Sequence, residues 1–143
     1  MDNSPRNAFL KGGGCGLDIS AEMVLFTRQL SEIASILGRT EDARRFDREA
    51  EALADLVKTK MWDPGRRFFY DLKLDGERAP VKTIAAYWTL LAKVADQSQA
   101  ADLVRELSNP VTFGRAHRGI ACLGVRRIRR RLLSGSRSWS ARR

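Results

Sequence analysis

Most residues able to do chemistry in this sequence fall outside any recognisable catalytic or ligand-binding pattern. Residues 11–16 read K-G-G-G-C-G, but the Lys and Ser or Thr that complete a phosphate-binding loop are absent, so the stretch predicts a flexible connection. Cys15 and Cys122 stand apart, without a Cys-x-x-Cys pair or a Cys/His cluster, which argues against a disulfide framework and a zinc site. We therefore predict no metal and no cofactor.

The first six residues, M-D-N-S-P-R, form a second candidate segment. Short polar residues at positions 2–4, ahead of Pro5, are typical of a turn or a helix cap, because such side chains bond nearby backbone amides. A cap at residue 2 has no element before it in the sequence. We therefore expect this segment to come from the middle of a longer domain.

Two apolar periodicities predict an antiparallel helical hairpin over residues 20–61. From Ser20 on, apolar residues recur every three or four positions: Met23, Phe26, Leu30, Ile33 and Leu37. After Thr40 a second stripe follows: Ala43, Phe46, Ala50, Leu53, Val57 and Met61. Gly38 suits the left-handed position that ends the first helix, and the short gap favours an antiparallel return.

The next stretch predicts a small β-hairpin and a second pair of helices. Residues 67–72 are aromatic-rich, and the following Asp75-Gly76 signals a tight turn. Residues 81–95 are apolar almost all round and predict a buried helix, and residues 98–107 predict another, which stops at Asn109-Pro110. This order predicts an all-α fold of antiparallel helical hairpins with one small β-hairpin, arranged as a solenoid or a closed toroid.

The net charge of +9 is confined to one end of the chain. Residues 1–114 hold 16 Lys and Arg against 17 Asp and Glu, whereas residues 115–143 hold ten Arg and no acid. No apolar run approaches the ~20 residues that span a bilayer, and no signal peptide is visible. We expect a protein without a membrane partner and, from these signals, a cytoplasmic location.

A series of motifs resembles the inverting α-glycosidases of glycoside hydrolase family 63 and the bacterial mannosylglycerate-hydrolase-like enzymes, with trehalases as more distant relatives. Residues 1–6 look like the second half of their Glu-Ser-Gly-x-Asp-Asn-Ser-Pro-Arg motif. Further similar stretches follow in order: D-I-S-A-E-M from 18, I-A-S-I-L-G-R from 33, M-W-D from 61, F-Y-D-L from 69, and N-P-V-T-F-G-R with H-R from 109. The resemblance covers residues 1–118.

The resemblance implies that residues 1–118 are part of an (α/α)6 toroid of six helical hairpins, with the active site at one mouth. Asp2 matches the catalytic general acid of these enzymes. Arg6 either binds sugar hydroxyls or anchors the loop, and Asp18 either contacts substrate at the mouth or is the N-cap of a helix. The implied substrate is a carbohydrate with an α-linked glucoside or mannoside: an oligosaccharide, or one similar to mannosylglycerate or trehalose.

Two departures from the family pattern limit the activity that we expect. The Glu-Ser-Gly ahead of Asp2 is absent, and the later segment that bears the catalytic base is not recognisable. Inverting hydrolysis needs both carboxyl groups, so we expect a fragment that is inactive alone. Oligomerisation that completes the site is an alternative, and the oligomeric state is left open.

Residues 119–143 have three interpretations. The arginines could bind nucleic acid or acidic lipid, although no recognition module accompanies them. They could form a solvated basic tail, disordered or loosely helical. Finally, a shifted reading frame could have produced them, since one codon choice for residues 130–132 reads Gly-Gly-Tyr one base later. The alternative function is accordingly a small all-α binding protein whose tail contacts nucleic acid or another polyanion.

Overall fold

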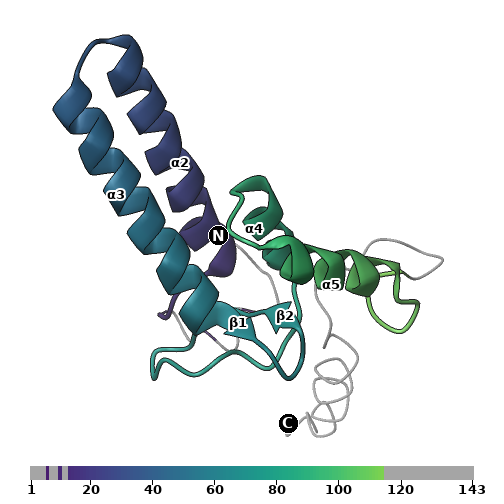
Figure 1. Ribbon diagram of the computed structural model, residues 1–143. Coiled ribbons are helices and arrows are strands. Elements are labelled where there is room, and N and C mark those ends of the chain that lie inside the picture. The colour runs from purple at the N-terminus through teal and green to yellow at the C-terminus, as the bar shows by residue number, and fades with distance from the viewer. Residues whose placement is uncertain (1–5, 7–9, 11–12, 115–143) are drawn as a thin grey trace, which may run out of the picture.

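The computed structural model describes Arg6, Leu10 and residues 13–114. Its two longest elements, α2 (Leu17–Ile36) and α3 (Thr40–Leu56), lie side by side and antiparallel (Figure 1). The predicted helical hairpin is therefore confirmed, although α2 begins three residues before Ser20. Asp2 and residues 119–143 lie outside the described residues, as does the predicted boundary after residue 118.

The two helices of this hairpin meet through small side chains. On α2 the buried residues are Leu17, Ala21, Val24, Thr27, Ser31 and Ala34. On α3 the predicted stripe is buried at Ala43 and Ala50, and the Ser31 hydroxyl donates a 3.1 Å hydrogen bond to the Ala43 carbonyl. The large residues of the predicted apolar stripe lie on the outer face: Met23, Phe26 and Ile33 of α2, and Leu37 just after it, are about half exposed or more. Small residues permit the close approach, so the larger ones are left on the other face.

The turn between the helices follows the predicted glycine signal. Gly38 has φ 72°, its amide donates to the Ser35 carbonyl, and the Arg39 amide donates to the Ala34 carbonyl at 2.8 Å. These two bonds form a Schellman motif, which requires a left-handed residue just past the helix end. Glycine meets that requirement without the steric cost of a Cβ atom.

The small β-hairpin is confirmed, but one turn earlier than predicted. α3 continues through a π-helical turn, η1 (Val57–Met61), into β1 (Trp62–Asp63), which pairs antiparallel with β2 (Phe68–Phe69). Asp63 Oδ1 closes the connecting turn by accepting the amides of Gly65 and Arg66 at 2.9 and 3.0 Å. The predicted Asp75-Gly76 turn exists too, but it closes only an isolated bridge between residues 72 and 78.

The continuous helix predicted over residues 81–95 is wrong. The segment is extended at Thr83, then forms a 3-10 turn, η2 (Ile84–Tyr87), and a short helix, α4 (Trp88–Leu91). Lys93, at φ 52°, ends α4 in a Schellman motif, with the Val94 amide donating to the Thr89 carbonyl at 2.8 Å. An apolar pattern that runs all round does not distinguish a long helix from short turns buried on several sides.

The last helix agrees with its prediction. α5 (Gln97–Ser108) covers residues 98–107 and ends before Asn109. A reciprocal capping box begins it: Asp96 accepts the Gln99 amide at 2.9 Å, while the Gln99 side chain accepts the Asp96 amide at 3.0 Å.

The glycine-rich stretch does not form the flexible connection predicted for it in its described part. Cys15 pairs with Leu72, with backbone hydrogen bonds of 2.9 and 3.0 Å in both directions. Gly14 has φ 92°, and a Cβ atom there would lie 2.3 Å from the Leu72 carbonyl oxygen. The glycines thus permit close backbone contact rather than mobility.

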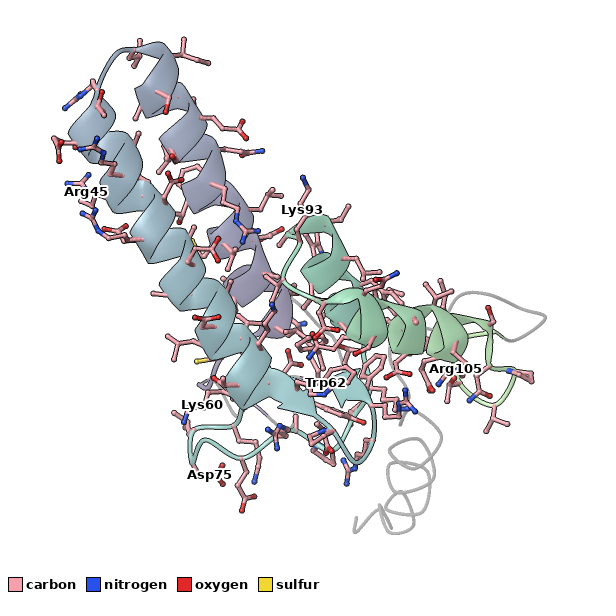
Figure 2. All side chains as sticks on the ribbon, in the orientation of Figure 1. Arg45, Lys60, Trp62, Asp75, Lys93 and Arg105 are labelled. Atoms are coloured by element: carbon pink, nitrogen blue, oxygen red, sulfur yellow. The ribbon has the colours of Figure 1, made fainter. Side chains whose placement is uncertain are left out.

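The core is concentrated where the N-terminus of α2 meets the β-hairpin and α5; we call this the packed end. Its centre is an aromatic cluster in which Phe68 contacts Tyr70, Tyr87 and Phe113, with ring centroids 5.5–6.3 Å apart. Figure 2 shows Trp62 inside this crowded region, whereas Arg45 projects from α3 on the side away from α2. Aromatic pairs at these separations stabilise the fold beyond the effect of burying their apolar area.

Candidate active-site segment

Two of the three residues predicted to act in the site are brought together at the packed end. Arg6 Nη2 donates to both carboxylate oxygens of Asp18, at 2.8 and 2.7 Å. Both side chains are largely removed from solvent, with 13% and 25% of their areas exposed. A charge-assisted contact of this kind is stronger than one between neutral groups. The Arg6 side chain is therefore joined to the first turn of α2.

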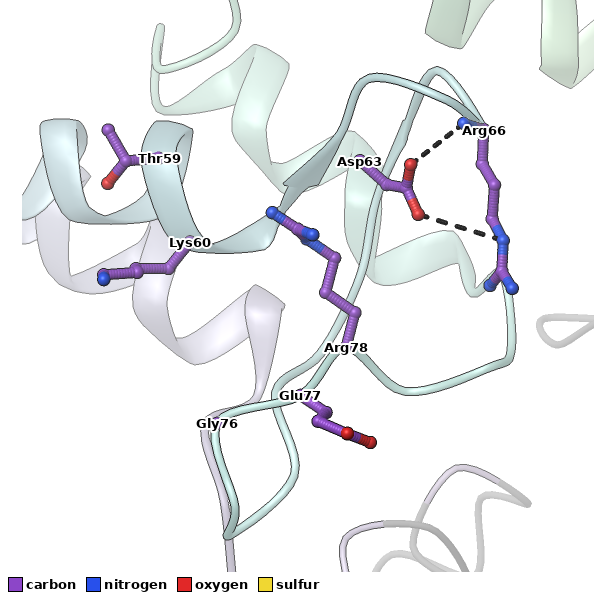
Figure 3. A pocket seen from close by; sticks show the side chains of 7 residues that line it. All are labelled: Thr59, Lys60, Asp63, Arg66, Gly76, Glu77 and Arg78. Carbon is purple, nitrogen blue, oxygen red and sulfur yellow. Dashed lines mark hydrogen bonds and ion pairs between the residues drawn. The ribbon is translucent and has the colours of Figure 1, made fainter.

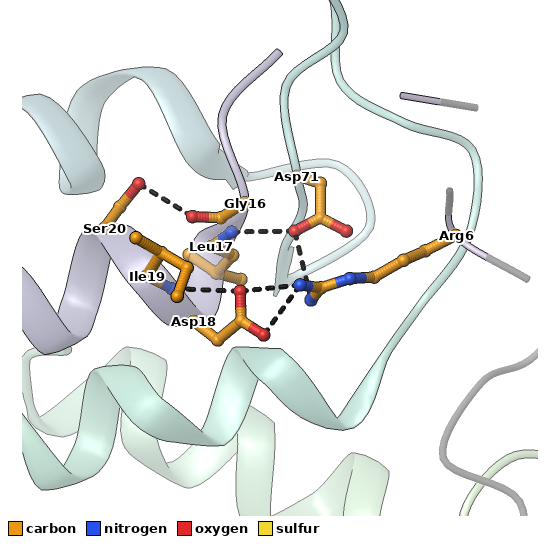
Figure 4. A network of polar contacts seen from close by, with 7 residues as sticks. All are labelled: Arg6, Gly16, Leu17, Asp18, Ile19, Ser20 and Asp71. Atoms are coloured by element: carbon orange, nitrogen blue, oxygen red, sulfur yellow. Dashed lines mark hydrogen bonds and ion pairs between the residues drawn. The ribbon is translucent and has the colours of Figure 1, made fainter. Parts of the chain in front are cut away.

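Asp18 is not the N-cap that one interpretation predicted. Gly16 occupies the N-cap position of α2 and has no side-chain capping bond, while Asp18 lies in the first turn. The cap comes from elsewhere in the chain, because Asp71 Oδ1 accepts the Leu17 amide at 2.7 Å (Figure 4). A carboxylate here also complements the positive end of the helix dipole.

Asp71 completes the cluster and lies almost wholly inside the protein, with 1% exposure. Its Oδ1 atom is 3.7 Å from Arg6 Nη1, and its Oδ2 atom is buried without a hydrogen-bond partner among the described residues. Burial raises the pKa of the Asp71 carboxyl above its ordinary value, although the Leu17 amide and the Arg6 charge both act in the opposite direction. The nearby Asp18 charge raises it further.

The cluster as a whole fastens two segments to one helix end. The Arg6 guanidinium lies between the carboxylates of Asp18 and Asp71 (Figure 4). Asp18 is the second residue of α2, and Asp71 follows β2 by two residues. The guanidinium is engaged by protein groups on both sides, so the arrangement favours anchoring over free display toward a ligand. What the cluster does chemically is fix the position of the Arg6 side chain against the start of α2.

The sequence did not single out Asp71 as part of a site. It lies in the aromatic F-Y-D-L stretch, which predicted a strand and was one of the stretches similar to the family, but neither signal gave it a role. Its hydrogen-bond partner, the Leu17 amide, is 54 positions away. Spacing along the chain does not reveal a pair joined only by the tertiary fold.

The described part of the chain holds neither a metal-binding cluster nor a membrane-spanning helix. No group of three or more His, Cys, Asp or Glu side chains is placed there to hold a metal ion. Among the helices formed by the same residues, none combines the length and the apolar character that crossing a membrane requires.

Comparison with known proteins shows first the fold of the chain and then the family to which it belongs. A solved structure named a sialidase is similar, with a TM-score of 0.68 and 21% sequence identity. The similarity covers 79% of this chain but 10% of that one, and at this identity it shows the fold alone: helical hairpins of the (α/α) class. The Mannosylglycerate hydrolase MGH1-like glycoside hydrolase domain matches residues 8–127, and the chain belongs to this family.

The family membership confirms the resemblance inferred from the motifs. The matched region begins after Asp2 and Arg6, however, and reaches past residue 118. The roles predicted for Asp2, Arg6 and Asp18 are therefore still predictions.

Proposed function

We propose that this chain supplies the general-acid segment of an inverting glycoside hydrolase that acts on α-linked glucosides or mannosides. Asp2 is the proposed acid, and Arg6 and Asp18 position the segment that carries it. The observation behind this proposal is the Arg6–Asp18–Asp71 cluster, in a chain that belongs to a glycoside hydrolase domain family. The cluster holds the Arg6 side chain at the start of α2, which supports the proposed positioning role.

The chemistry of inversion accounts for the residue type at position 2. One protonated carboxyl group gives its proton to the leaving glycosidic oxygen, while a second carboxylate activates water on the opposite face of the sugar, roughly 6.5–9.5 Å away. An acid in this role needs partial desolvation, because its pKa must rise toward the working pH. A segment fastened to a rigid helix end holds such a group in place.

The second carboxylate, in this proposal, comes from outside the 143 residues. Support comes from the outer face of α2, where Met23, Phe26 and Ile33 expose apolar area that a neighbouring hairpin of an (α/α)6 toroid would cover. The chain also spans a tenth of the sialidase that it resembles in fold. Within a complete toroid, Asp2 and the base would face each other across the mouth.

The test uses a longer protein that contains this segment. Asp2→Asn should abolish hydrolysis of an α-linked disaccharide while leaving the melting temperature unchanged, and proton NMR should show the β-anomer as the first product of the unaltered protein. The 143-residue chain alone should be inactive on the same substrates. Near-normal turnover by the Asn variant, or retention of the α-configuration, would remove Asp2 or the inverting mechanism respectively.

A further inference from the structure

A basic pocket lies at the packed end, between the η1 turn and the turn that contains Gly76 (Figure 3). Its volume is about 500 Å³, within the range of small-molecule sites. It is lined by Thr59, Lys60, Asp63, Arg66, Gly76, Glu77 and Arg78. Three of these side chains are cationic and two are acidic, and none belongs to the Arg6–Asp18–Asp71 cluster.

Both carboxylates of the basic pocket are already engaged by other groups. Asp63 accepts two backbone amides through Oδ1, and its Oδ2 lies 3.8 Å from Arg66 Nε. Glu77 accepts a 2.5 Å hydrogen bond from Lys73, which lies outside the pocket lining. Little negative charge is therefore left to neutralise the other two cations.

Those two cations, Arg78 and Lys60, have no hydrogen-bond or ion-pair partner within the described part of the chain. Arg78 is partly buried, and its Nε atom is sealed from solvent without an acceptor. A buried donor left unpaired costs free energy, and the cost is larger for a charged group. An oxyanion in the pocket would supply the opposite charge that no acidic side chain among the described residues gives to this guanidinium.

The backbone of Arg78 is held firmly enough to present its side chain. Residue 78 bridges to Leu72, and the following amide, of Ala79, donates to the Asp71 carbonyl at 2.8 Å. Lys60, on the other side, extends from the end of the η1 turn. The two cations thus reach the pocket from separate, anchored elements.

We propose that the basic pocket binds a small oxyanion, the carboxylate or phosphate group of a small molecule, with Arg78 as its main ligand and Lys60 as the second. The planar guanidinium matches two oxygens of either group, and the ammonium adds a point charge. Arg66 contributes less, since it is shared with Asp63 and lies over the Tyr70 ring at 5.6 Å. This proposal is independent of the glycosidase mechanism.

The test is an NMR titration of the ¹⁵N-labelled 143-residue chain with inorganic phosphate, with acetate, and with chloride at matched ionic strength. The amides of Gly76 and Thr59 should shift and saturate with phosphate, acetate or both, but not with chloride. Arg78→Gln should weaken this binding by about ten-fold, the loss of one charge-assisted pair. Lys60→Gln, at an exposed position, should weaken it less while leaving the fold unchanged.

The matched control is Arg44→Gln, on α3, where Arg44 is exposed and paired with Glu41. It should leave the titration unchanged. The proposal is overturned if chloride shifts Gly76 and Thr59 equally, or if neither the Arg78 nor the Lys60 variant weakens binding. Shifts confined to the arginine-rich residues 115–143 would overturn it as well.

Discussion

The packed end and the shaft of the helical hairpin are built on opposite principles. The packed end buries large aromatic side chains, with Phe68 fully enclosed. In the shaft, residues 20–55, alanines and small polar residues lie between the helices while large apolar residues such as Phe26, 53% exposed, face outward. The contrast shows that the apolar content of an element does not determine how much it stabilises the fold, because the stabilisation depends on the apolar area that is removed from water.

The largest expected effect compares one phenylalanine from each region. Phe68→Ala should lower the free energy of unfolding by about 3–5 kcal/mol, because it empties the centre of the aromatic cluster. Phe26→Ala should change it by less than about 1 kcal/mol, since half of that ring is already in water. Urea unfolding followed by circular dichroism measures both. Equal losses would mean that the shaft has a second core.

The next effect concerns the polar contacts at the packed end. Asp71→Ala should cost about 1–3 kcal/mol, because the Leu17 amide loses its acceptor inside the protein. Asp55→Ala, at an exposed position on α3, is the control and should stay within about 0.5 kcal/mol of the unaltered chain. An Asp71 variant as stable as the control would show that the cap contributes nothing.

A smaller effect compares the two Schellman ends. Lys93→Gly should stabilise the chain by up to about 1 kcal/mol, because the left-handed backbone at position 93 no longer carries a Cβ atom. Gly38→Lys should destabilise it by about 1 kcal/mol for the same reason. Thermal melting of the two variants should show a higher melting temperature for Lys93→Gly and a lower one for Gly38→Lys. If both variants were destabilised alike, the Lys93 side chain would have to stabilise the packed end through its own contacts.

The smallest effect is a pH dependence whose sign differs between two aspartates of the packed end. Hydrogen bonds from the Gln99 amide and Ser98 lower the pKa of Asp96. The stability that Asp96 contributes is therefore fully present above its unfolded pKa of about 3.9. It is lost as the pH falls through the lower pKa of the folded state. The pKa of Asp71 is raised, so its contribution is full below about 3.9 and is lost as pH rises through the folded value.

Two neutral variants separate these opposite slopes. Asp96→Asn keeps a capping oxygen but does not titrate, so its stability relative to the unaltered chain should improve below about pH 4. Asp71→Asn should show the reverse trend over the range just above that pH. Urea unfolding at intervals between pH 3 and pH 7 measures both, and parallel curves would contradict the assigned shifts.

The sequence was informative where the signal was local. Gly38 predicted a helix end because glycine meets the left-handed requirement, and the apolar periodicity of residues 98–107 predicted α5. Lys93 meets the same backbone requirement as Gly38 but carries no such signal, so the helix predicted over residues 81–95 had no visible stop. The hydrogen bonds from the Lys93 and Val94 amides to Leu90 and Thr89 close the turn in that conformation.

The orientation of α2 and part of the candidate site depended on information that lies outside local sequence. Periodicity identified an apolar stripe on α2 but not which face meets α3, because the small residues that decide the approach score as weakly apolar. The motif resemblance predicted Arg6 and Asp18 as site residues, and the structure joins them. Asp71 was missed because its two partners come from distant segments.

The cap that Asp71 provides has a consequence for synthesis on the ribosome. The Leu17 amide at the start of α2 finds its acceptor 54 residues later in the chain. Until residue 71 has left the exit tunnel, the first turn of α2 is complete in sequence but lacks this bond. The base of α2 in the nascent chain can therefore gain this cap only after residue 71 has emerged.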